Sequence, residues 1–259
     1  VPSKDSCRSR PGTPDLLATQ SFTKFWRETA LKSMENQRRH ILVINPNSNE
    51  SVTEVMAREL KVFHFPEGPQ IECLSLPEGP FGIESQADIE AVTLPLRKMV
   101  SERRNVDAFV IACYSDPGLH VCREASEKPV FGIQECGILM AMSRGDRFGV
   151  IALQEHSIRR HLRYLRQMGV MERLAGERVA GLSVEESVSG KDTFEKLLAA
   201  AEQLRDSDQA DTIILGCAGM ASHRVELESG IGIPVIDPVQ AAVSMAIHSL
   251  LTTHQSEES

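Results

Sequence analysis

Two of the six cysteines end the same short sequence pattern. Residues 107–113 (Asp-Ala-Phe-Val-Ile-Ala-Cys) and residues 211–217 (Asp-Thr-Ile-Ile-Leu-Gly-Cys) both run from an acidic residue through an apolar stretch to a cysteine. The offset is 104 residues at both ends (211 − 107 and 217 − 113). A thiol, with an unperturbed pKa of about 8.5, can act as a base when ionised and as an acid when protonated. If Cys113 and Cys217 faced one carbon from opposite sides, they could remove a proton from one face and return one to the other.

A single cysteine at the end of a buried strand is usually a small core residue. The repetition favours chemistry instead, because each cysteine is followed by a loop that suits a site. After Cys113 we expect Asp116 to be a helix N-cap and Pro117 the first helical residue. After Cys217, the small residues Ala218 and Gly219 let backbone amides approach a ligand. We expect these amides and helix N-termini to lower both thiol pKa values and to stabilise an enolate-like intermediate.

The elements that must position the cysteines alternate between strand and helix patterns. Short apolar runs predict strands, and stretches of helical spacing predict helices. In the first part of the chain the expected strands are 41–44, 71–74 and 108–112, and the expected helices are 51–62 and 88–102.

The same order returns further along the chain. A strand at 148–151 corresponds to 41–44, and a helix at 156–168 corresponds to the helix that begins at 51. The core is therefore a duplicated α/β unit, roughly 41–135 and 148–239. This pattern predicts parallel sheets with right-handed crossovers, and in such sheets ligands bind beyond the carboxyl ends of the strands.

The predicted fold class is therefore α/β, with two pseudo-symmetric lobes. Each lobe is a mostly parallel sheet flanked by helices, and the active site is expected in the cleft between them. We expect residues 1–40 to form an N-terminal arm, disordered or accessory, with a short amphipathic helix at 22–33. The first lobe is expected to comprise 41–135 plus about 236–259, and the second lobe 136–235.

Composition narrows the possible roles. With 41% hydrophobic and 25% charged residues, the 259-residue chain is typical of an ordinary globular protein. A net charge of −8 argues against sequence-independent nucleic-acid binding, and no apolar stretch approaches the ~18–20 residues of a membrane span. The chain also begins without the pattern of a secretory signal, and its cysteines lack disulfide-framework spacing. We therefore expect free thiols and a cytoplasmic location.

Five ordered segments resemble the Asp/Glu/hydantoin racemase superfamily, and specifically its hydantoin/allantoin racemase branch. They are Ile-Asn-Pro-Asn-Ser (44–48), Gly-Pro (79–80) with Ile-Glu-Ser (83–85), Ala-Cys-Tyr-Ser-Asp-Pro-Gly (112–118), Gly-Cys-Ala-Gly-Met (216–220) and Ile-Pro-Val-Ile-Asp-Pro (233–238). The resemblance covers about 41–251. It implies a cofactor-independent racemase, without a metal, that forms a homo-oligomer. The implied reaction moves the C5 proton of a 5-substituted hydantoin or of allantoin between two cysteines.

The resemblance also implies roles for individual residues. Cys113 and Cys217 would be the acid/base pair, and Asn45 would hydrogen-bond the substrate ring. The residues implied to line the pocket, partly through backbone groups, are Ile83, Tyr114, Ala218 and Gly219. Amino-acid racemases of the superfamily resemble a Cys-Asn-Thr and Gly-Cys-Thr pattern, which this chain lacks, so a small-molecule substrate with a flat neutral ring is favoured over an amino acid.

Other interpretations remain open. The same fold could racemise an amino acid or act on a malonate-type carbon acid, or the chain could be a catalytically silent ureide-binding protein. Cys113, His120 and Cys122 match no zinc spacing. The helix that carries His156, His161 and several arginines is expected to present a solvated face. Glu84 and Glu135 are candidates for polar site groups or for structural roles.

Overall fold

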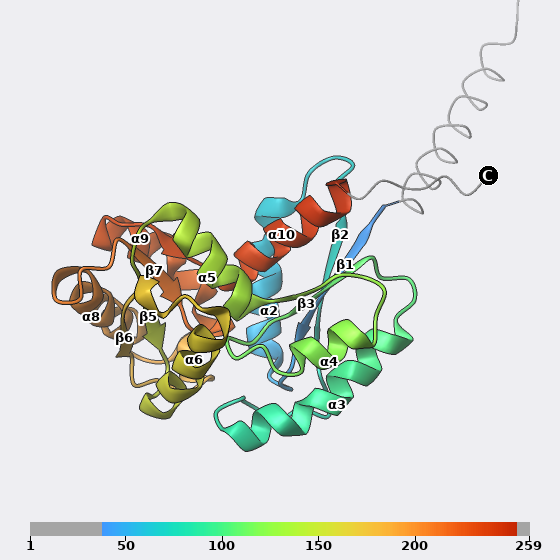
Figure 1. Cartoon of the computed structure of the whole chain (residues 1–259), viewed down its shortest axis with the longest axis horizontal. Helices are drawn as coiled ribbons and strands as arrows, with labels where there is room; N and C mark the ends of the chain where they lie inside the picture. Colours follow the sequence, from blue (N-terminus) through green and yellow to red (C-terminus); the bar gives the residue numbers. More distant parts are fainter. Residues whose placement is uncertain (1–37, 253–259) are drawn as a thin grey trace, which may run out of the picture. The chain divides into compact units, whose positions relative to one another are not determined.

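Two four-stranded parallel sheets of identical strand order form the framework of the protein (Figure 1). The computed structural model describes residues 38–252. The first sheet has the order β2-β1-β3-β4, and the second has the order β6-β5-β7-β8. The strands are β1 (His40–Asn45), β2 (Gln70–Ser75), β3 (Ala108–Ile111), β4 (Val130–Gly132), β5 (Phe148–Ala152), β6 (Leu174–Val179), β7 (Thr212–Leu215) and β8 (Val235–Ile236). This arrangement confirms the predicted α/β fold of two pseudo-symmetric lobes; the helix expected at 22–33 lies outside the described residues.

The duplication extends to individual backbone hydrogen bonds at the ends of the central strands. The Ala112 amide donates to the Ile44 carbonyl at 2.8 Å, and the Gly216 amide donates to the Ile151 carbonyl at 2.9 Å. Ala112 and Gly216 are the residues immediately before the two cysteines. The two cysteines are therefore fixed to equivalent places of the two sheets.

The acidic residue of each repeated segment has a structural role. The Asp107 carboxylate accepts from the His40 amide at 2.8 Å, and the Asp211 carboxylate accepts from the Arg147 amide at 3.0 Å. In both lobes the carboxylate ties the start of one central strand to the start of its neighbour. This use explains why an aspartate opens both segments, far from the cysteine end.

Helices connect successive strands, as parallel pairing requires. The α-helices are α2 (Glu50–Glu59), α3 (Gln86–Glu102), α4 (Leu119–Glu124), α5 (Ile133–Arg144), α6 (Glu155–Met168), α7 (Glu186–Ser189), α8 (Thr193–Asp206), α9 (Arg224–Ile231) and α10 (Pro238–Thr252). Three short 3₁₀ segments are Leu60–Phe63, Met171–Arg173 and Ala218–His223. The helix expected over 51–62 is thus α2 followed by a 3₁₀ turn, and the helix expected over 156–168 is α6, which ends at Gly169 with a φ of 72°.

Helices α5 and α10 pack against each other between the sheets (Figure 1). Helix α5 follows the first sheet in sequence and contacts its last strand, β4, but it also contacts β5, β7 and β8 of the second sheet. Helix α10 follows the second sheet but contacts β1, β3 and β4 of the first. The two helices come so close that a Cβ atom on Gly137 would lie 2.9 Å from the Cβ atom of Pro238. From these contacts we propose that α5 is part of the second lobe and α10 is part of the first lobe.

Two hydrophobic cores cover the two faces of the first sheet. Along β1, Leu42 and Ile44 belong to the core under α3 and α4, whereas Ile41 and Val43 belong to the other core, following the alternation of strand side chains. That second core also contains Phe148 of the second sheet. One continuous core therefore joins the two lobes.

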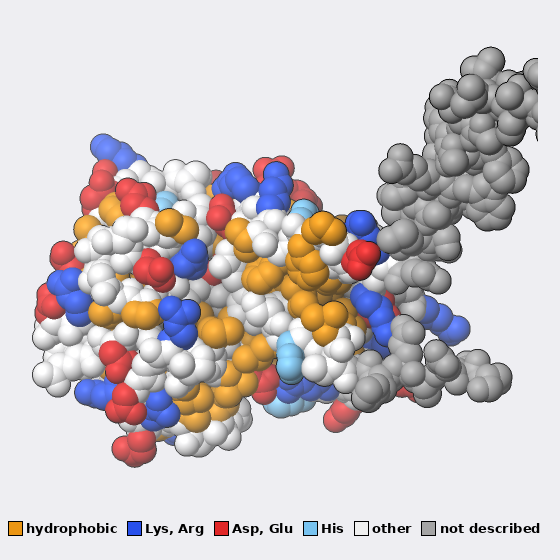
Figure 2. All heavy atoms as spheres, turned by 90° about the horizontal axis from the view of Figure 1, so that it is seen from above, with side chains coloured by type: hydrophobic (Ala, Val, Ile, Leu, Met, Phe, Trp, Pro, Cys, Tyr) orange, Lys and Arg blue, Asp and Glu red, His pale blue; other side chains and the backbone are white. Residues whose placement is uncertain are grey.

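The surface carries charges of both signs. Figure 2 shows acidic and basic side chains interspersed over the described face, with apolar side chains between them. Among residues 38–252, no helix combines the length and the apolar character needed to cross a membrane.

Candidate active site

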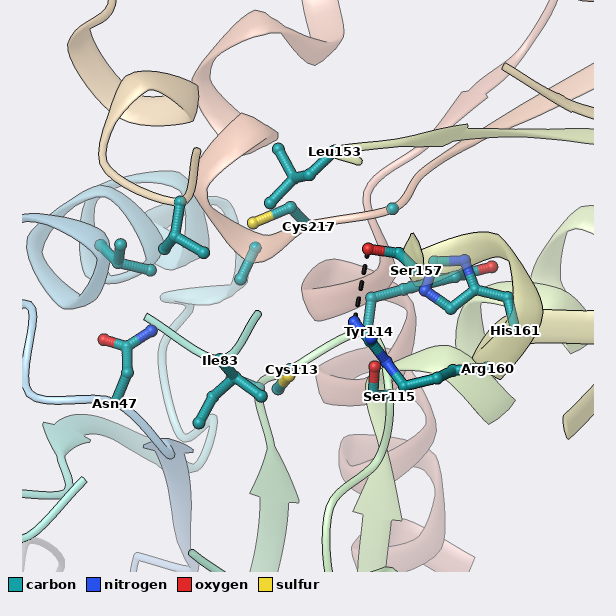
Figure 3. A pocket seen from close by; sticks show the side chains of 15 residues that line it. Asn47, Ile83, Cys113, Tyr114, Ser115, Leu153, Ser157, Arg160, His161 and Cys217 are labelled. Carbon is teal, nitrogen blue, oxygen red and sulfur yellow. Dashed lines mark hydrogen bonds between the residues drawn. The ribbon is translucent and has the colours of Figure 1, made fainter. Parts of the chain in front are cut away.

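Cys113 and Cys217 line the same pocket, which lies beyond the carboxyl ends of β3 and β7 (Figure 3). The two thiols also interact electrostatically, because negative charge on Cys217 raises the pKa of Cys113. The pocket takes lining residues from both lobes. From the first lobe these include Asn47, Val52, Ile83, Tyr114 and Ser115, and from the second lobe Leu153, Ser157, Arg160, His161, Val184 and Ala218.

Burial controls the Cys113 thiol. It raises the pKa well above the ordinary value of 9.0, and the charges of Cys217 and Asp116 raise it further; Arg160 and the Ser115 amide lower it. The expectation that a helix N-terminus lowers this pKa is therefore wrong. The physical reason is burial, which outweighs the lowering by Arg160 and the Ser115 amide; α4 itself begins only at Leu119.

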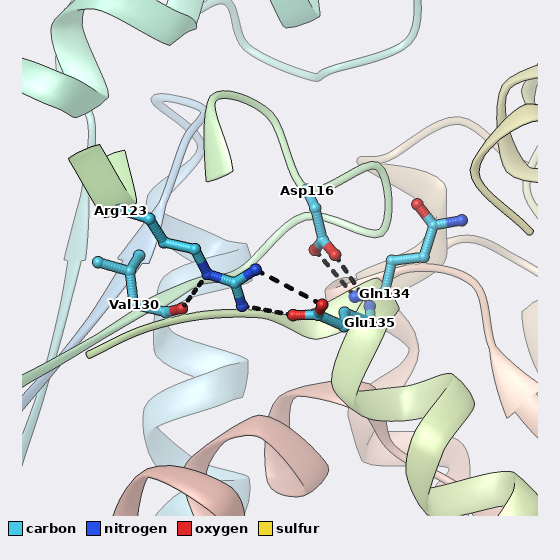
Figure 4. A network of polar contacts seen from close by, with 5 residues as sticks. All are labelled: Asp116, Arg123, Val130, Gln134 and Glu135. Carbon is cyan, nitrogen blue, oxygen red and sulfur yellow. Dashed lines mark hydrogen bonds and ion pairs between the residues drawn. The ribbon is translucent and has the colours of Figure 1, made fainter. Parts of the chain in front are cut away.

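Asp116 caps a different helix from the one expected (Figure 4). Its carboxylate accepts from the amides of Gln134 at 2.9 Å and Glu135 at 2.8 Å, which lie in the first turn of α5. Its φ of 42° is left-handed, and Gly118 is the N-cap of α4. Burial raises the pKa of Asp116 to about 7, although the two amides lower it. The turn after Cys113 is thus tied to the start of α5.

The Asp116 carboxylate comes so close to the start of α5 that the N-cap residue of this helix must be a glycine. A Cβ atom on Gly132 would lie 2.3 Å from the carboxyl carbon of Asp116. Next to this cap, Arg123 donates to the Val130 carbonyl at 3.0 Å and forms an ion pair with Glu135 (Figure 4). Glu135 therefore has a structural partner and does not line the pocket.

The Cys217 thiol has hydrogen-bond partners of its own. It accepts from the Gly219 amide at 3.4 Å and lies 3.8 Å from the Ser187 hydroxyl. Burial raises the pKa of Cys217, and these two contacts lower it. The residue at 219 must be small, because a Cβ atom there would lie 2.3 Å from the Ser187 oxygen. Gly219 thus contacts the thiol itself and is not among the pocket-lining residues, while Ser187, on α7, was not predicted.

Asn45 is fully buried behind the pocket wall. Its amide nitrogen donates to the Asn47 side chain at 2.9 Å, the Asn49 carbonyl at 3.2 Å and the Thr53 hydroxyl at 3.0 Å. Asn47 lines the pocket and Asn45 does not. In this structure Asn45 therefore orders the loop that presents Asn47. The other residues expected to line the pocket, Ile83, Tyr114 and Ala218, do so.

The expectation of a solvated α6 face is wrong for Arg160 and His161, which line the pocket. His161 is buried, its Nδ1 lies 2.9 Å from a buried Glu177 oxygen, and its ring meets Tyr114 edge-to-face at 5.1 Å. The spacing of the arginines along the sequence could not reveal that Arg160 and His161 line the pocket, because their placement depends on how the two lobes meet.

One feature of the sequence did indicate that the start of α6 forms a wall of the pocket. Ser157 stands three residues after the N-cap of α6, and Val52 stands three residues after the N-cap of α2. Both residues line the pocket. The duplication, extended to the first helical turns, would have marked this part of α6 as a pocket wall.

The comparison with known proteins agrees with this architecture. The sequence model of the family described as Asp/Glu/Hydantoin racemase matches residues 41–246. The chain belongs to this racemase family. It is 37% identical over 211 residues to a hydantoin racemase of Paenarthrobacter aurescens, covering 80% of this chain and 89% of that protein. It is 36% identical over 225 residues to a hydantoin racemase of Rhizobium meliloti, covering 80% and 87%.

A solved structure of an allantoin racemase is also similar to this chain. The allantoin racemase from Klebsiella pneumoniae superposes with a TM-score of 0.78 at 30% identity, covering 82% of this chain and 87% of that chain. These relatives make the protein a racemase, an enzyme of the isomerase class.

Two polar links hold the lobes of the racemase together beside the pocket. The Val184 amide donates to the Glu84 carboxylate at 3.2 Å, and Arg163 donates to the Gln86 side chain at 2.9 Å. Because Val184 and Ile83 both line the pocket, the Glu84 bond fixes the gap between two of its apolar walls.

Within the described part of the racemase, no group of three or more His, Cys, Asp or Glu side chains is placed to hold a metal ion. Cys122 is fully buried in the core under α3 and α4.

Proposed function

We propose that this racemase inverts C5 of a 5-substituted hydantoin or of allantoin, with Cys113 and Cys217 as its acid/base pair. The observation that carries the proposal is the pair itself: the two cysteines follow equivalent strands in two duplicated lobes, and both line one pocket. The hydantoin and allantoin racemases among the relatives support the substrate class.

In the proposed reaction, the thiolate of one cysteine takes the C5 proton and becomes a thiol. The electron pair of the broken C–H bond moves into the adjacent ring carbonyl and gives a planar enolate. The thiol of the other cysteine then donates its proton to the opposite face of C5 and becomes the thiolate, so charge and atoms balance. The opposite enantiomer uses the same two groups in exchanged roles.

The raised thiol pKa values suit this chemistry. A carbon acid is weak, and a base of high pKa accepts its proton with a smaller energetic penalty. The contacts of the Cys217 sulfur with the Gly219 amide and the Ser187 hydroxyl offset part of the cost of ionising a buried thiol. Asn47, Ile83, Tyr114 and Ala218 surround the space that the ring would occupy, and Asn45 would act through Asn47.

The test replaces each cysteine separately by serine. We expect Cys113→Ser and Cys217→Ser each to slow racemisation of allantoin and of a 5-alkylhydantoin by at least about 100-fold, because a hydroxyl is a far weaker acid than a thiol. Decay of circular dichroism from one pure enantiomer measures the rate, and mass spectrometry in heavy water measures deuterium at C5. Cys73→Ser, in β2 and outside the pocket, is the control that should retain activity.

The outcomes separate the alternatives. Persistent racemisation by the double Cys→Ser variant would contradict the mechanism. An active wild type that inverts an amino acid or consumes a malonate-type acid, but no ureide, would contradict the substrate class. Ureide binding without any turnover would indicate a binding protein. Assembly into a homo-oligomer and a cytoplasmic location stay predictions.

A further inference from the structure

One wall of the pocket carries a cation without a counter-ion. Arg160 lines the pocket, and its buried Nε has no hydrogen-bond partner. Its two terminal nitrogens make only long contacts of 3.4 Å, to the His156 carbonyl and the Ser157 hydroxyl of its own helix. Within residues 38–252, no carboxylate lies within ion-pair distance of its guanidinium. A partly buried charge in this condition is costly unless a partner arrives.

The neighbouring charged groups do not supply that partner. Among the charged neighbours, ionised Cys113 has the largest effect on the pKa of Arg160 and raises it, Arg163 lowers it and Asp88 raises it. Burial raises the pKa of Cys113 and keeps it mostly a neutral thiol at neutral pH. The Asp88 carboxylate is occupied at the start of α3, where it accepts from the Ser85 amide at 2.7 Å. The other basic side chain of this wall, His161, is held by Glu177 at 2.9 Å. Arg160 is therefore the free positive group among the described lining residues.

The pocket is symmetric in its thiols and asymmetric in its walls. Across the pocket from α6 lie Ile83 and the neutral side chain of Asn47, while α6 contributes Ser157, Arg160 and His161 (Figure 3). At equivalent positions in the first turns of α2 and α6, the first lobe has Val52 and the second lobe has Ser157. Such a difference can hold a substrate in one orientation, with its polar substituent toward α6.

We propose that Arg160 is a specificity-determining residue that binds a carboxylate carried on the C5 substituent of the substrate. The enzyme would then prefer 5-(carboxyalkyl)hydantoins to hydantoins with neutral side chains of equal size. This inference rests on the proposed function, since it names the subclass of substrate that the same pocket takes. A guanidinium matches a carboxylate by charge and by its planar array of N–H donors.

The experiment compares substrates that differ only in charge. Values of kcat/KM are measured for 5-(2-carboxyethyl)hydantoin and its neutral isostere 5-(2-carbamoylethyl)hydantoin. We expect wild type to favour the carboxylate, and Arg160→Gln to reduce this preference by about 10- to 100-fold, the usual weight of a hydrogen bond to a charged group. Arg160→Lys should keep part of the preference for the carboxylate substrate. Arg159→Gln, on the exposed side of the same helix, is the matched control and should change nothing.

An equal loss on both substrates in Arg160→Gln would overturn the proposal and assign Arg160 to the thiol or the ring instead. A wild type that favours the neutral isostere would overturn it as well. If wild type racemises no hydantoin, the proposed function fails, and calorimetric binding of 5-(2-carboxyethyl)hydantoin decides the role of Arg160. Weaker binding by Arg160→Gln than by Arg159→Gln would support it, and equal or undetectable binding by both would overturn it.

Discussion

Cys113 and Cys217 occupy equivalent positions but have different neighbours. Cys217 has the Gly219 amide and the Ser187 hydroxyl beside its sulfur, whereas the groups that lower the pKa of Cys113 are Arg160 and the Ser115 amide. Burial is the largest effect at both thiols and raises both pKa values. Each thiol is therefore predominantly protonated at neutral pH, and the reactive thiolate is the minor form.

The raised pKa values of the two thiols predict how the rate depends on pH. Racemisation needs one thiolate and one thiol, and the scarce species below the raised pKa values is the thiolate. Its fraction grows about tenfold per pH unit in that range, so kcat/KM should rise with pH and reach no plateau below the ordinary thiol value of 9.0. Steady-state rates on allantoin across neutral and alkaline pH measure it. Because kcat/KM reports the ionisations of the free enzyme, a plateau reached near neutral pH would contradict the raised thiol pKa values.

Sequence reasoning found the cysteines because a repeated pattern is visible within one chain. It missed Arg160, His161 and Ser187 because their place depends on how the two lobes meet, which no local periodicity records. Asp116 was misassigned for a related reason. An aspartate before Pro-Gly suits a local cap, but its carboxylate accepts instead from α5 amides 18 and 19 residues further on.

Strands β3 and β7 were predictable because each is a short, fully buried apolar run that begins after an aspartate. One difference at their cysteine ends matters for the backbone. The first lobe has Ala112 where the second lobe has Gly216, and a Cβ atom on Gly216 would lie 2.4 Å from the Ile151 carbonyl oxygen. Ala112 makes the equivalent hydrogen bond with a side chain present, so it is the local backbone geometry at Gly216 that leaves no room for one. The position of Cys217 thus depends on a glycine.

Gly216→Ala should separate the end of β7 from β5 and move the adjacent Cys217. We expect a loss of about 1–3 kcal/mol in the free energy of unfolding and a fall of about 100-fold in kcat/KM, the scale of a 1 Å displacement of a reacting group. Urea unfolding and the dichroism assay measure these two effects.

Gly230→Ala is the control for that substitution. Gly230 lies in α9, where the nearest atom to a Cβ would be Leu198 Cδ1 at 3.6 Å. Alanine there should stabilise the helix by up to about 1 kcal/mol and leave the rate unchanged. A Gly216→Ala variant with unaltered rate and stability would show that the close approach to Ile151 does not fix the thiol.

Both lobes share one hydrophobic core, so they should unfold together although each has its own sheet. Buried residues of β1, such as Val43, and of β5, such as Phe148, belong to the same cluster. Helices α5 and α10 pack against each other between the sheets; α5 contacts strands of both sheets, and α10 contacts β1, β3 and β4. The sequence indicated two similar halves; it could not indicate that their cores merge, because that depends on which faces of α5 and α10 meet.

Phe148→Ala tests this merging. Removing a fully buried aromatic side chain from β5 should cost about 3–5 kcal/mol. If the core acts as one unit, amide hydrogen exchange of the slowest protons in β1 should accelerate by the same free energy as those in β5, although the substitution lies in the other sheet. Leu139→Ala, at an exposed position of α5, should leave both strands nearly unchanged. Protection lost in β5 alone would show that the lobes unfold separately, and the pocket between them would then open without unfolding of the first lobe.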